Sequence, residues 1–233
     1  MKVAIMQPYF FPYIGYFQLI KTVDKFIVYD NIKYTKKGWI NRNRLLFNGK
    51  EQLFTIPIRK GSDSLDICQR ELSENCKIET TKILERIRLN YRKAPYFNEV
   101  YPLTEKSFFL EDTNLFRYIF FSLQQILAYL GIRTEILISS KIGVEERLAG
   151  ENRVISICKH LNASQYINSI GGVALYSRER FSEEGIILRF LKSNQVIYKQ
   201  FDNEFIPSLS ILDVMMFNSP QKICEMLNQY ELV

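Results

Sequence analysis

The residue types best suited to binding and catalysis gather in the first 45 positions of the chain. A short apolar segment, Lys2–Met6, runs into a turn rich in tyrosine and proline, and a second apolar segment, Lys25–Tyr29, ends on Asp30. In an open parallel sheet, ligands bind outside the carboxyl ends of the strands. We therefore predict a site that begins where both segments end. Its candidate residues are Gln7, Tyr9, Tyr13, Gly15, Tyr16 and Asp30.

A basic segment with a single tryptophan follows Asp30. Arginine grips phosphate through two parallel hydrogen bonds and lysine attracts it as a point charge, while an indole ring can stack on a base or a sugar. These residues predict an anion-binding site, although an exposed basic loop without a ligand would have the same composition. The candidates are Lys37, Trp39, Asn41, Arg42 and, further along, Arg59.

Two glycines after a predicted strand mark a third group of candidates. Gly171 and Gly172 follow the strand at Gln165–Asn168, and their backbone N–H groups could approach a phosphate or a carboxylate. An ordinary tight turn is the simpler explanation. The candidates are Asn168, Ser169, Gly171 and Gly172. At the start of a predicted helix, Glu151–Arg153 forms either a capping turn or a charged clamp, and capping is the simpler of the two.

The residues on which many enzymes depend are scarce. The one histidine, His160, lies two residues after Cys158 on a predicted helix, so the two side chains point to different faces and form no dyad. The four cysteines show no Cys-x-x-Cys spacing. No metal site is predicted, and the sequence lacks the motifs of zinc proteases, α/β-hydrolases, P-loop NTPases and the common dinucleotide-binding proteins.

The composition is that of a folded protein with an anionic partner. Of 233 residues, 47% are hydrophobic and 24% are charged, and the net charge is +6. This excess of positive charge suits a nucleotide, a nucleotide-linked sugar or RNA. The longest apolar region, residues 115–132, contains Arg117 and two glutamines, so no membrane span is predicted. Because no secretory signal precedes the first strand, we expect a cytoplasmic protein with reduced thiols.

Strand-like and helix-like patterns alternate along most of the chain. This alternation predicts an α/β fold, a three-layer sandwich with a mostly parallel sheet. We expect one domain over residues 1–233, with residues 32–102 as a candidate inserted subdomain. Within the insertion we predict a short strand at Asp66–Cys68 and a helix at Lys77–Tyr91. Outside it, a further strand is predicted at Val196–Tyr198.

A β-hairpin is predicted at the start of the insertion. Its strands are Trp39–Phe47 and Gln52–Ile58, and Asn48–Gly49 between them is a strong signal for a tight hairpin turn. The hairpin either projects from the main sheet or forms its antiparallel edge.

Several segments, in fixed order, resemble the WbqC-like family. The first is the run Gln7–Tyr16, followed by Asp30 and by Lys36–Asn43. Further matching segments are Thr55–Ile58, Tyr91–Phe97, Ser139–Ser140, Tyr166–Gly172 and Leu209–Asp213. The family is associated with gene clusters for bacterial O-antigen, a part of lipopolysaccharide, and for other surface polysaccharides. The resemblance implies a transferase that adds an aminoacyl group, such as glycyl, to the amine of a nucleotide-linked amino sugar.

Each group of candidates has an expected role in that reaction. Asp30 accepts the proton of the sugar amine or anchors the amine. The oxyanion is stabilised by Tyr13, by Tyr16 or by backbone N–H groups near the glycines. The pyrophosphate binds the cations Lys37, Arg42 and Arg59. The acyl donor is either an aminoacyl-tRNA or an amino acid activated by ATP.

A more distant likeness concerns the run Tyr13–Tyr16. Its position between the first strand and the first helix resembles that of the HxGH signature in the nucleotidyltransferase and class I aminoacyl-tRNA synthetase fold, which is Rossmann-like. Ser139–Lys141 weakly resembles the second, KMSKS-type signature. Here tyrosines replace the histidines, and each neutral phenol donates one hydrogen bond. The alternatives to acyl transfer are therefore a nucleotidyltransferase or adenylate-forming enzyme, and a non-catalytic protein that binds nucleotide sugars.

Overall fold

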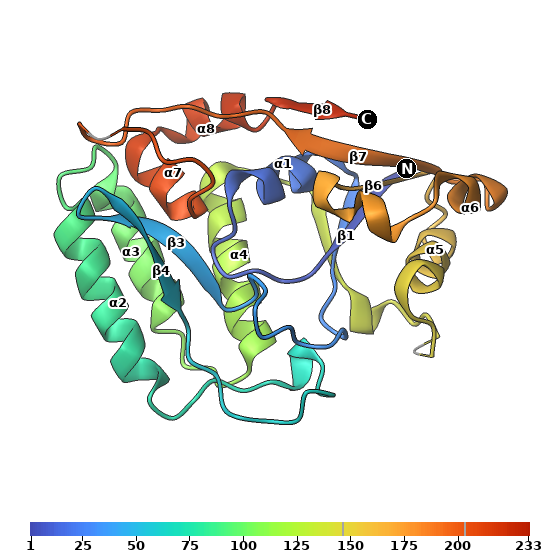
Figure 1. Cartoon of the computed structure of the whole chain (residues 1–233), viewed down its shortest axis with the longest axis horizontal. Coiled ribbons are helices and arrows are strands. Elements are labelled where there is room, and N and C mark those ends of the chain that lie inside the picture. Colours follow the sequence, from blue (N-terminus) through green and yellow to red (C-terminus); the bar gives the residue numbers. More distant parts are fainter. Residues whose placement is uncertain (146, 203) are drawn as a thin grey trace.

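A six-stranded sheet runs through the centre of the molecule (Figure 1). The computed structural model describes residues 1–145, 147–202 and 204–233. Along the sheet the strands lie in the order β5-β2-β1-β6-β7-β8, and all neighbours are parallel except β7 and β8. Their bounds are β1 Lys2–Met6, β2 Lys25–Val28, β5 Glu135–Ile138, β6 Gln165–Ser169, β7 Ile187–Ser193 and β8 Tyr230–Leu232.

Helices cover both faces of this sheet, because its central strands are apolar on both sides. On one face, α1 (Ile14–Thr22) packs on the sheet, and α4 (Leu115–Leu130), α7 (Ile211–Phe217) and α8 (Pro220–Met226) belong to the same core. The other face packs against α5 (Gly150–His160) and α6 (Arg178–Glu183). Phe26 and Val28 point into the first core, and Ile27 between them points into the second. The predicted three-layer α/β sandwich is therefore confirmed.

The order of the strands reverses next to β1. The chain adds β2 and then β5 on one side of β1, and afterwards β6 and β7 on the other side. In chain order, the five parallel strands thus lie as 3-2-1-4-5, which is a doubly wound arrangement with its switch point between β1 and β6. The carboxyl ends of these two strands diverge, and a ligand crevice is expected between them. The more specific nucleotidyltransferase-type topology stays a prediction.

A long insertion separates β2 from β5. It contains the hairpin of β3 (Arg42–Phe47) and β4 (Lys50–Thr55), then η1 (Ile67–Gln69), α2 (Cys76–Tyr91) and α3 (Phe97–Phe108), before α4. At the hairpin turn, Asn48 and Gly49 have φ values of 52° and 71°, as a type I′ turn requires. The hairpin is a separate two-stranded sheet that packs on α2 and α7. The antiparallel edge of the main sheet is β8. The division of the chain into domains stays a prediction.

Two predicted strands are wrong. Asp66 forms only an isolated bridge with Lys33, and Ile67 and Cys68 lie in the 3₁₀ helix η1, because Asp66 and Gln69 form a capping box that closes a turn there. Val196–Tyr198 is an irregular segment, and the Tyr198 hydroxyl donates a hydrogen bond to Asp213. The sequence reading also missed α3, which contains Pro102, and the short elements α6 and β8. In the described part of the chain, no helix has the length and apolar character needed to cross a bilayer.

Candidate functional site

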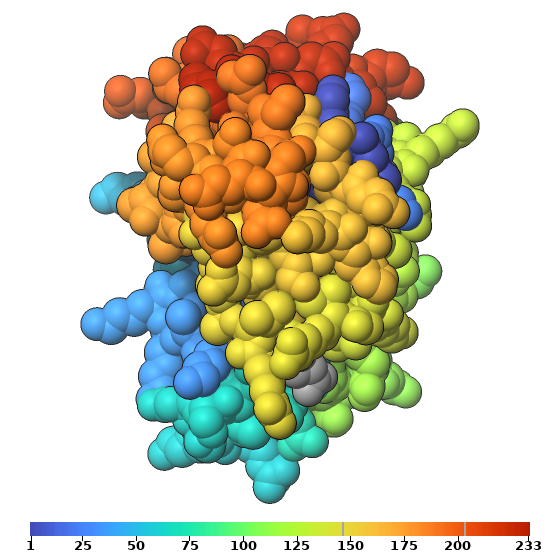
Figure 2. Space-filling view, turned by 90° about the vertical axis from the view of Figure 1, so that its right-hand side faces the viewer, coloured from blue at the N-terminus to red at the C-terminus, as the bar shows by residue number. Residues whose placement is uncertain are grey.

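A cavity of about 460 Å³ lies between the carboxyl ends of β1 and β6, and we call it the switch-point cavity. Its polar and aromatic lining comes from the ends of β1, β2 and β6, the start of α5 and the 3₁₀ helix η3 (Ile170–Leu175). Those lining residues are Gln7, Tyr9, Tyr29, Glu151, Asn168, Ser169, Gly171, Gly172 and Tyr176. Figure 2 shows the neighbouring segments of the 140–190 region, in yellow and orange, next to the blue segment that follows β2.

Asn168 and Gly172 form one closely packed side of the switch-point cavity. The Asn168 side chain accepts a hydrogen bond from the Ser169 N–H at 2.7 Å and donates one to the Tyr166 hydroxyl at 3.1 Å. A Cβ atom on Gly172 would lie 2.9 Å from Asn168 Nδ2, whereas one on Gly171 would meet only Ser169 Oγ at 4.0 Å. Glycine at position 172 therefore lets the backbone of η3 approach the asparagine side chain.

Among the described residues that line the switch-point cavity, Glu151 supplies the one carboxylate. It lies in the first turn of α5, and its Oε1 accepts a hydrogen bond at 2.6 Å from the N–H of Ser177, the N-cap residue of α6. Glu151 therefore joins the starts of α5 and α6. This arrangement resembles the predicted capping turn more than the predicted charged clamp. One carboxylate oxygen remains without a hydrogen bond to another described residue.

Arg153 places a positive charge behind the same cavity. Its side chain is 3% exposed, and its guanidinium carbon lies 5.7 Å from the ring centroid of Tyr29. The guanidinium donates to the Glu145 carbonyl at 3.2 Å, and its Nε has no acceptor within the described ranges. Burial raises the pKa of Tyr29 despite this cation, so the phenol stays neutral and can donate a hydrogen bond.

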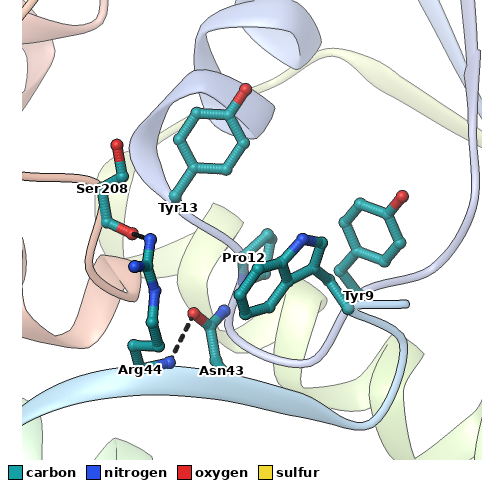
Figure 3. Close-up of a pocket in the computed structure, with 7 residues that line it drawn as sticks. Tyr9, Pro12, Tyr13, Asn43, Arg44 and Ser208 are labelled. Carbon is teal, nitrogen blue, oxygen red and sulfur yellow. Dashed lines mark hydrogen bonds between the residues drawn. The ribbon is translucent and has the colours of Figure 1, made fainter. Parts of the chain in front are cut away.

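A second cavity, of about 300 Å³, lies on the other side of Tyr9, and we call it the aromatic pocket (Figure 3). It is lined by Tyr9, Pro12, Tyr13, Trp39, Asn43, Arg44 and Ser208. Arg44 donates to the Ser208 carbonyl at 3.3 Å and pairs with Glu51 at 2.8 Å. Tyr9 is the residue that lines both cavities, so they meet at one side chain.

Gly15 explains the position of Tyr13 in the aromatic pocket. Tyr13 is the N-cap residue of α1, and its ring lies across the first turn of that helix. A Cβ atom on Gly15 would lie 2.3 Å from Tyr13 Cε2, so a side chain there would displace the ring. Burial raises the pKa of both Tyr9 and Tyr13, and both phenols are therefore neutral hydrogen-bond donors at physiological pH.

Two predicted catalytic residues lie beneath the site and do not line it. Tyr16 is 2% exposed, and its hydroxyl donates to the Gln7 carbonyl at 3.0 Å, which fixes the turn after β1. Asp30 is also 2% exposed, and its two oxygens accept hydrogen bonds from the Ser140 N–H at 2.9 Å and the Ser140 hydroxyl at 2.6 Å. Asp30 thus ties the end of β2 to the turn η2 (Ser139–Lys141).

Of the candidates in the basic segment, one lines a cavity and the others do not. Trp39 lines the aromatic pocket, whereas the buried Asn41 accepts from the Tyr34 hydroxyl at 2.9 Å and donates to the Ile56 carbonyl at 2.7 Å. The Arg42 guanidinium donates to the carbonyls of Lys37 and Gly38, so it shapes this loop while the Lys37 side chain is exposed.

Arg59 lies apart from both cavities, in a groove beside α2, where it pairs with Glu71 at 3.1 Å. The single predicted pocket is therefore two adjacent cavities, one of which contains the predicted Gln7, Asn168 and glycines. The sequence reading missed Tyr29, Tyr176 and Ser208, whereas Asn43 and Arg44 belong to the basic segment that it marked after Asp30. Tyr29 could have been found, since it ends a predicted strand, but nothing local marks Ser208. Among the described residues, no cluster of three histidine, cysteine, aspartate or glutamate side chains could hold a metal ion.

The fold and the cavities together define a doubly wound α/β protein with a cavity at its switch point. The chain belongs to the WbqC-like protein family, whose model matches residues 7–225. It is 33% identical over 224 residues to "Uncharacterized protein Rv1507c" of Mycobacterium tuberculosis (strain ATCC 25618 / H37Rv), and the match covers 93% of each chain. No solved structure matches the sequence. The resemblance seen in the ordered segments is thus confirmed.

Proposed function

We propose that this protein is an enzyme of bacterial O-antigen or surface-polysaccharide synthesis that transfers an aminoacyl group to the amine of a nucleotide-linked amino sugar. The observation that carries the proposal is the position of Tyr9, which lines two cavities at once. A transfer reaction needs two ligands whose reacting atoms meet, and cavities that share one wall bring their ligands together.

The switch-point cavity suits the acceptor, the nucleotide-linked sugar. Its volume of about 460 Å³ is in the usual range for small-molecule sites. The amides of Gln7 and Asn168 and the hydroxyl of Ser169 can bind the hydroxyls of a sugar or the edge of a base. The buried cation of Arg153 favours an anionic ligand at this end of the sheet.

In the proposed reaction, the neutral amine attacks the carbonyl carbon of the acyl donor in the aromatic pocket. A carbon–nitrogen bond forms, and the bond from the carbonyl carbon to the leaving oxygen breaks. The proton of the amine passes to the carboxylate of Glu151 and then to the leaving oxygen. The phenols of Tyr9 and Tyr13 donate hydrogen bonds to the oxyanion. Asp30 holds η2 in place, and the role of base that the sequence suggested for it falls to Glu151.

The test is direct. The purified protein is incubated with dTDP-4-amino-4,6-dideoxyglucose and, in turn, with glycine and ATP, glycyl-tRNA or an acyl-CoA. We expect the mass of the nucleotide sugar to increase by one acyl group with one of these donors. Absence of a mass increase with every donor, although the nucleotide sugar binds, would favour a non-catalytic sugar-nucleotide-binding protein instead.

A nucleotidyltransferase or adenylate-forming enzyme is the second candidate. It is favoured by the bond between Asp30 and Ser140, because this bond ties the KMSKS-like turn to the strand next to β1. Such an enzyme would release pyrophosphate from ATP or CTP in the presence of Mg²⁺. Release that does not depend on an amino sugar would support this candidate over acyl transfer.

A further inference from the structure

One segment of the chain, of which Trp39, Asn43 and Arg44 line the aromatic pocket, carries a net charge equal to that of the whole protein. Residues 31–50 contain no acidic side chain. Their basic residues are Lys33, Lys36, Lys37, Arg42, Arg44 and Lys50. Without these six, the remaining 25 basic residues balance the 25 acidic ones (31 − 6 = 25), so the rest of the chain is neutral. A segment with this excess of positive charge favours an anionic ligand.

Part of this charge has no carboxylate to offset it. Lys36 pairs with Asp63 at 2.8 Å and Arg44 with Glu51 at 2.8 Å. The Arg42 guanidinium donates only to backbone carbonyls, which satisfy its hydrogen bonds but leave its charge in place. Lys33 and Lys37 are exposed and form no ion pair with another described residue. These cations flank the loop that carries Trp39.

Trp39 is suited to stacking on a base. It is the one tryptophan of the chain, is 41% exposed and forms part of the wall of the aromatic pocket. The guanidinium carbons of Arg42 and Arg44 lie 5.8 Å and 5.4 Å from its ring centroid. Proteins bind single-stranded nucleic acid with aromatic rings that stack on the bases and with cations that follow the phosphate backbone.

We infer that this surface binds the unpaired 3′ end of an RNA, with its terminal base stacked on Trp39 at the mouth of the aromatic pocket. The inference rests on the proposed function, because the RNA would carry the aminoacyl ester to the acceptor across Tyr9. The ester bond to the ribose oxygen breaks, and that oxygen takes up the proton. ATP and a coenzyme A thioester contain adenosine and phosphates, as the 3′ end of the RNA does. The basic segment extends beyond the pocket, however, and this suits the longer phosphate chain of an RNA.

The fluorescence of Trp39 is a direct probe of this contact, since no other tryptophan contributes. We expect an RNA minihelix that ends in an unpaired ACCA to quench it, and the same helix with a blunt end to bind about tenfold more weakly. Trp39→Phe and Trp39→Ala are compared by anisotropy of a 5′-labelled minihelix. Phenylalanine should retain most of the affinity, while alanine should lose about tenfold. Lys37→Ala should reduce the dependence of the affinity on salt.

Lys159→Ala is the matched control. It removes one exposed cation from α5, where Lys159 pairs with Glu184 at 2.7 Å, and it should leave RNA binding unchanged. Equal binding of blunt and unpaired ends, unchanged affinity in Trp39→Ala, or complete displacement by ATP or coenzyme A would overturn the inference. Binding of the nucleotide sugar is measured calorimetrically on the same samples. If it persists without RNA binding, only this inference fails; if it is also absent, the proposed function fails.

Discussion

Glu151 and Asp30 show how the surroundings of a carboxylate decide what it can do. Both lie near the carboxyl ends of the central strands, and sequence position alone favours Asp30. The structure surrounds Asp30 with two donors from Ser140 and leaves it 2% exposed, whereas Glu151 lines the switch-point cavity. A group that must accept a proton from a ligand has to reach that ligand, so geometry favours Glu151.

Substitution of each carboxylate separates these roles. Glu151→Gln retains the shape of the side chain but not its basicity, so we expect kcat to fall about a hundredfold or more with little change in KM. Asp30→Asn loses one acceptor for Ser140 and should destabilise the fold by about 1–2 kcal/mol while retaining most of the turnover. Kinetics and thermal unfolding of both variants check this. Loss of turnover in Asp30→Asn, with unchanged KM and stability, would return the role of base to Asp30.

The reactivity of the cysteines tests whether the core is packed as described. No disulfide joins the described cysteines, and burial raises the pKa of Cys76 to about 11 and that of Cys158 to about 12. Thiols react as thiolates, so at pH 9 only about one part in a hundred of Cys76 is reactive. Iodoacetamide at pH 8 should therefore label the partly exposed Cys68 and Cys224 well before the other two. Mass spectrometry of the native protein checks this, and early labelling of Cys158 would contradict it.

At the scale of elements, the sequence predicted the helices and strands that depend on local signals. It did not predict those that depend on tertiary contacts. The hairpin turn at Asn48–Gly49 and the long helix α4 followed from residues close in sequence. The helix α3 could not be predicted in this way, because Pro102 argues against a helix and only packing against α2, α4 and α7 compensates for it. The strand β8 depends wholly on its partner β7, 37 or more residues away along the chain.

The turn after β6 allows a test at this scale with a control in the adjacent position. Gly172→Ala would place its methyl group 2.9 Å from Asn168 Nδ2 and push that amide away from the switch-point cavity. We expect nucleotide-sugar binding to weaken about tenfold, the equivalent of one lost hydrogen bond. Gly171→Ala has room for its methyl group and should bind as the wild type does. Calorimetry distinguishes them, and equal affinities would contradict the packing described for Asn168.

At the scale of the whole molecule, Asp213 joins parts of the chain that are far apart. It is buried in α7 and accepts hydrogen bonds from Tyr91 of α2 at 2.6 Å, from Tyr198 at 2.6 Å and from Gln200 at 2.8 Å. Tyr91 in turn accepts from the N–H of Leu46 in the hairpin. This cluster connects the insertion to the C-terminal segment, and so supports the β3 strand that positions Arg44 in the aromatic pocket.

Asp213→Asn replaces one carboxylate oxygen, an acceptor, with an NH₂ group, a donor. The three groups around it, from Tyr91, Tyr198 and Gln200, are themselves donors. The substitution should lower the free energy of unfolding by about 1–3 kcal/mol. Burial raises the pKa of Asp213, so the carboxyl contributes stability that is present below its unfolded pKa and is lost as pH rises through the folded value. The difference between wild type and Asp213→Asn should therefore be larger at pH 4.5 than at pH 7.5. Urea unfolding at both values checks this, and a difference that grows with pH would contradict it.

The site also shows what a sequence can predict at this scale. Gln7, Tyr9 and the residues from Asn168 to Gly172 were predicted because strand ends in a parallel sheet converge on one edge. The division into two cavities was not predicted. The aromatic pocket brings together Ser208 and Arg44, which are 164 positions apart and meet through a hydrogen bond from the Arg44 guanidinium to the Ser208 carbonyl. Arg44 belongs to the basic segment that the sequence marks as anion-binding, whereas no local pattern identifies Ser208.

The central claim is that the acceptor binds between β1 and β6, on the far side of Tyr9 from the acyl donor. A crystal structure of the protein with a dTDP-linked amino sugar tests it most directly. We predict density for the nucleotide against Gln7 and Asn168, with the sugar amine within hydrogen-bond distance of Glu151. Density in the groove beside Arg59, or an empty switch-point cavity at saturating ligand, would contradict the account.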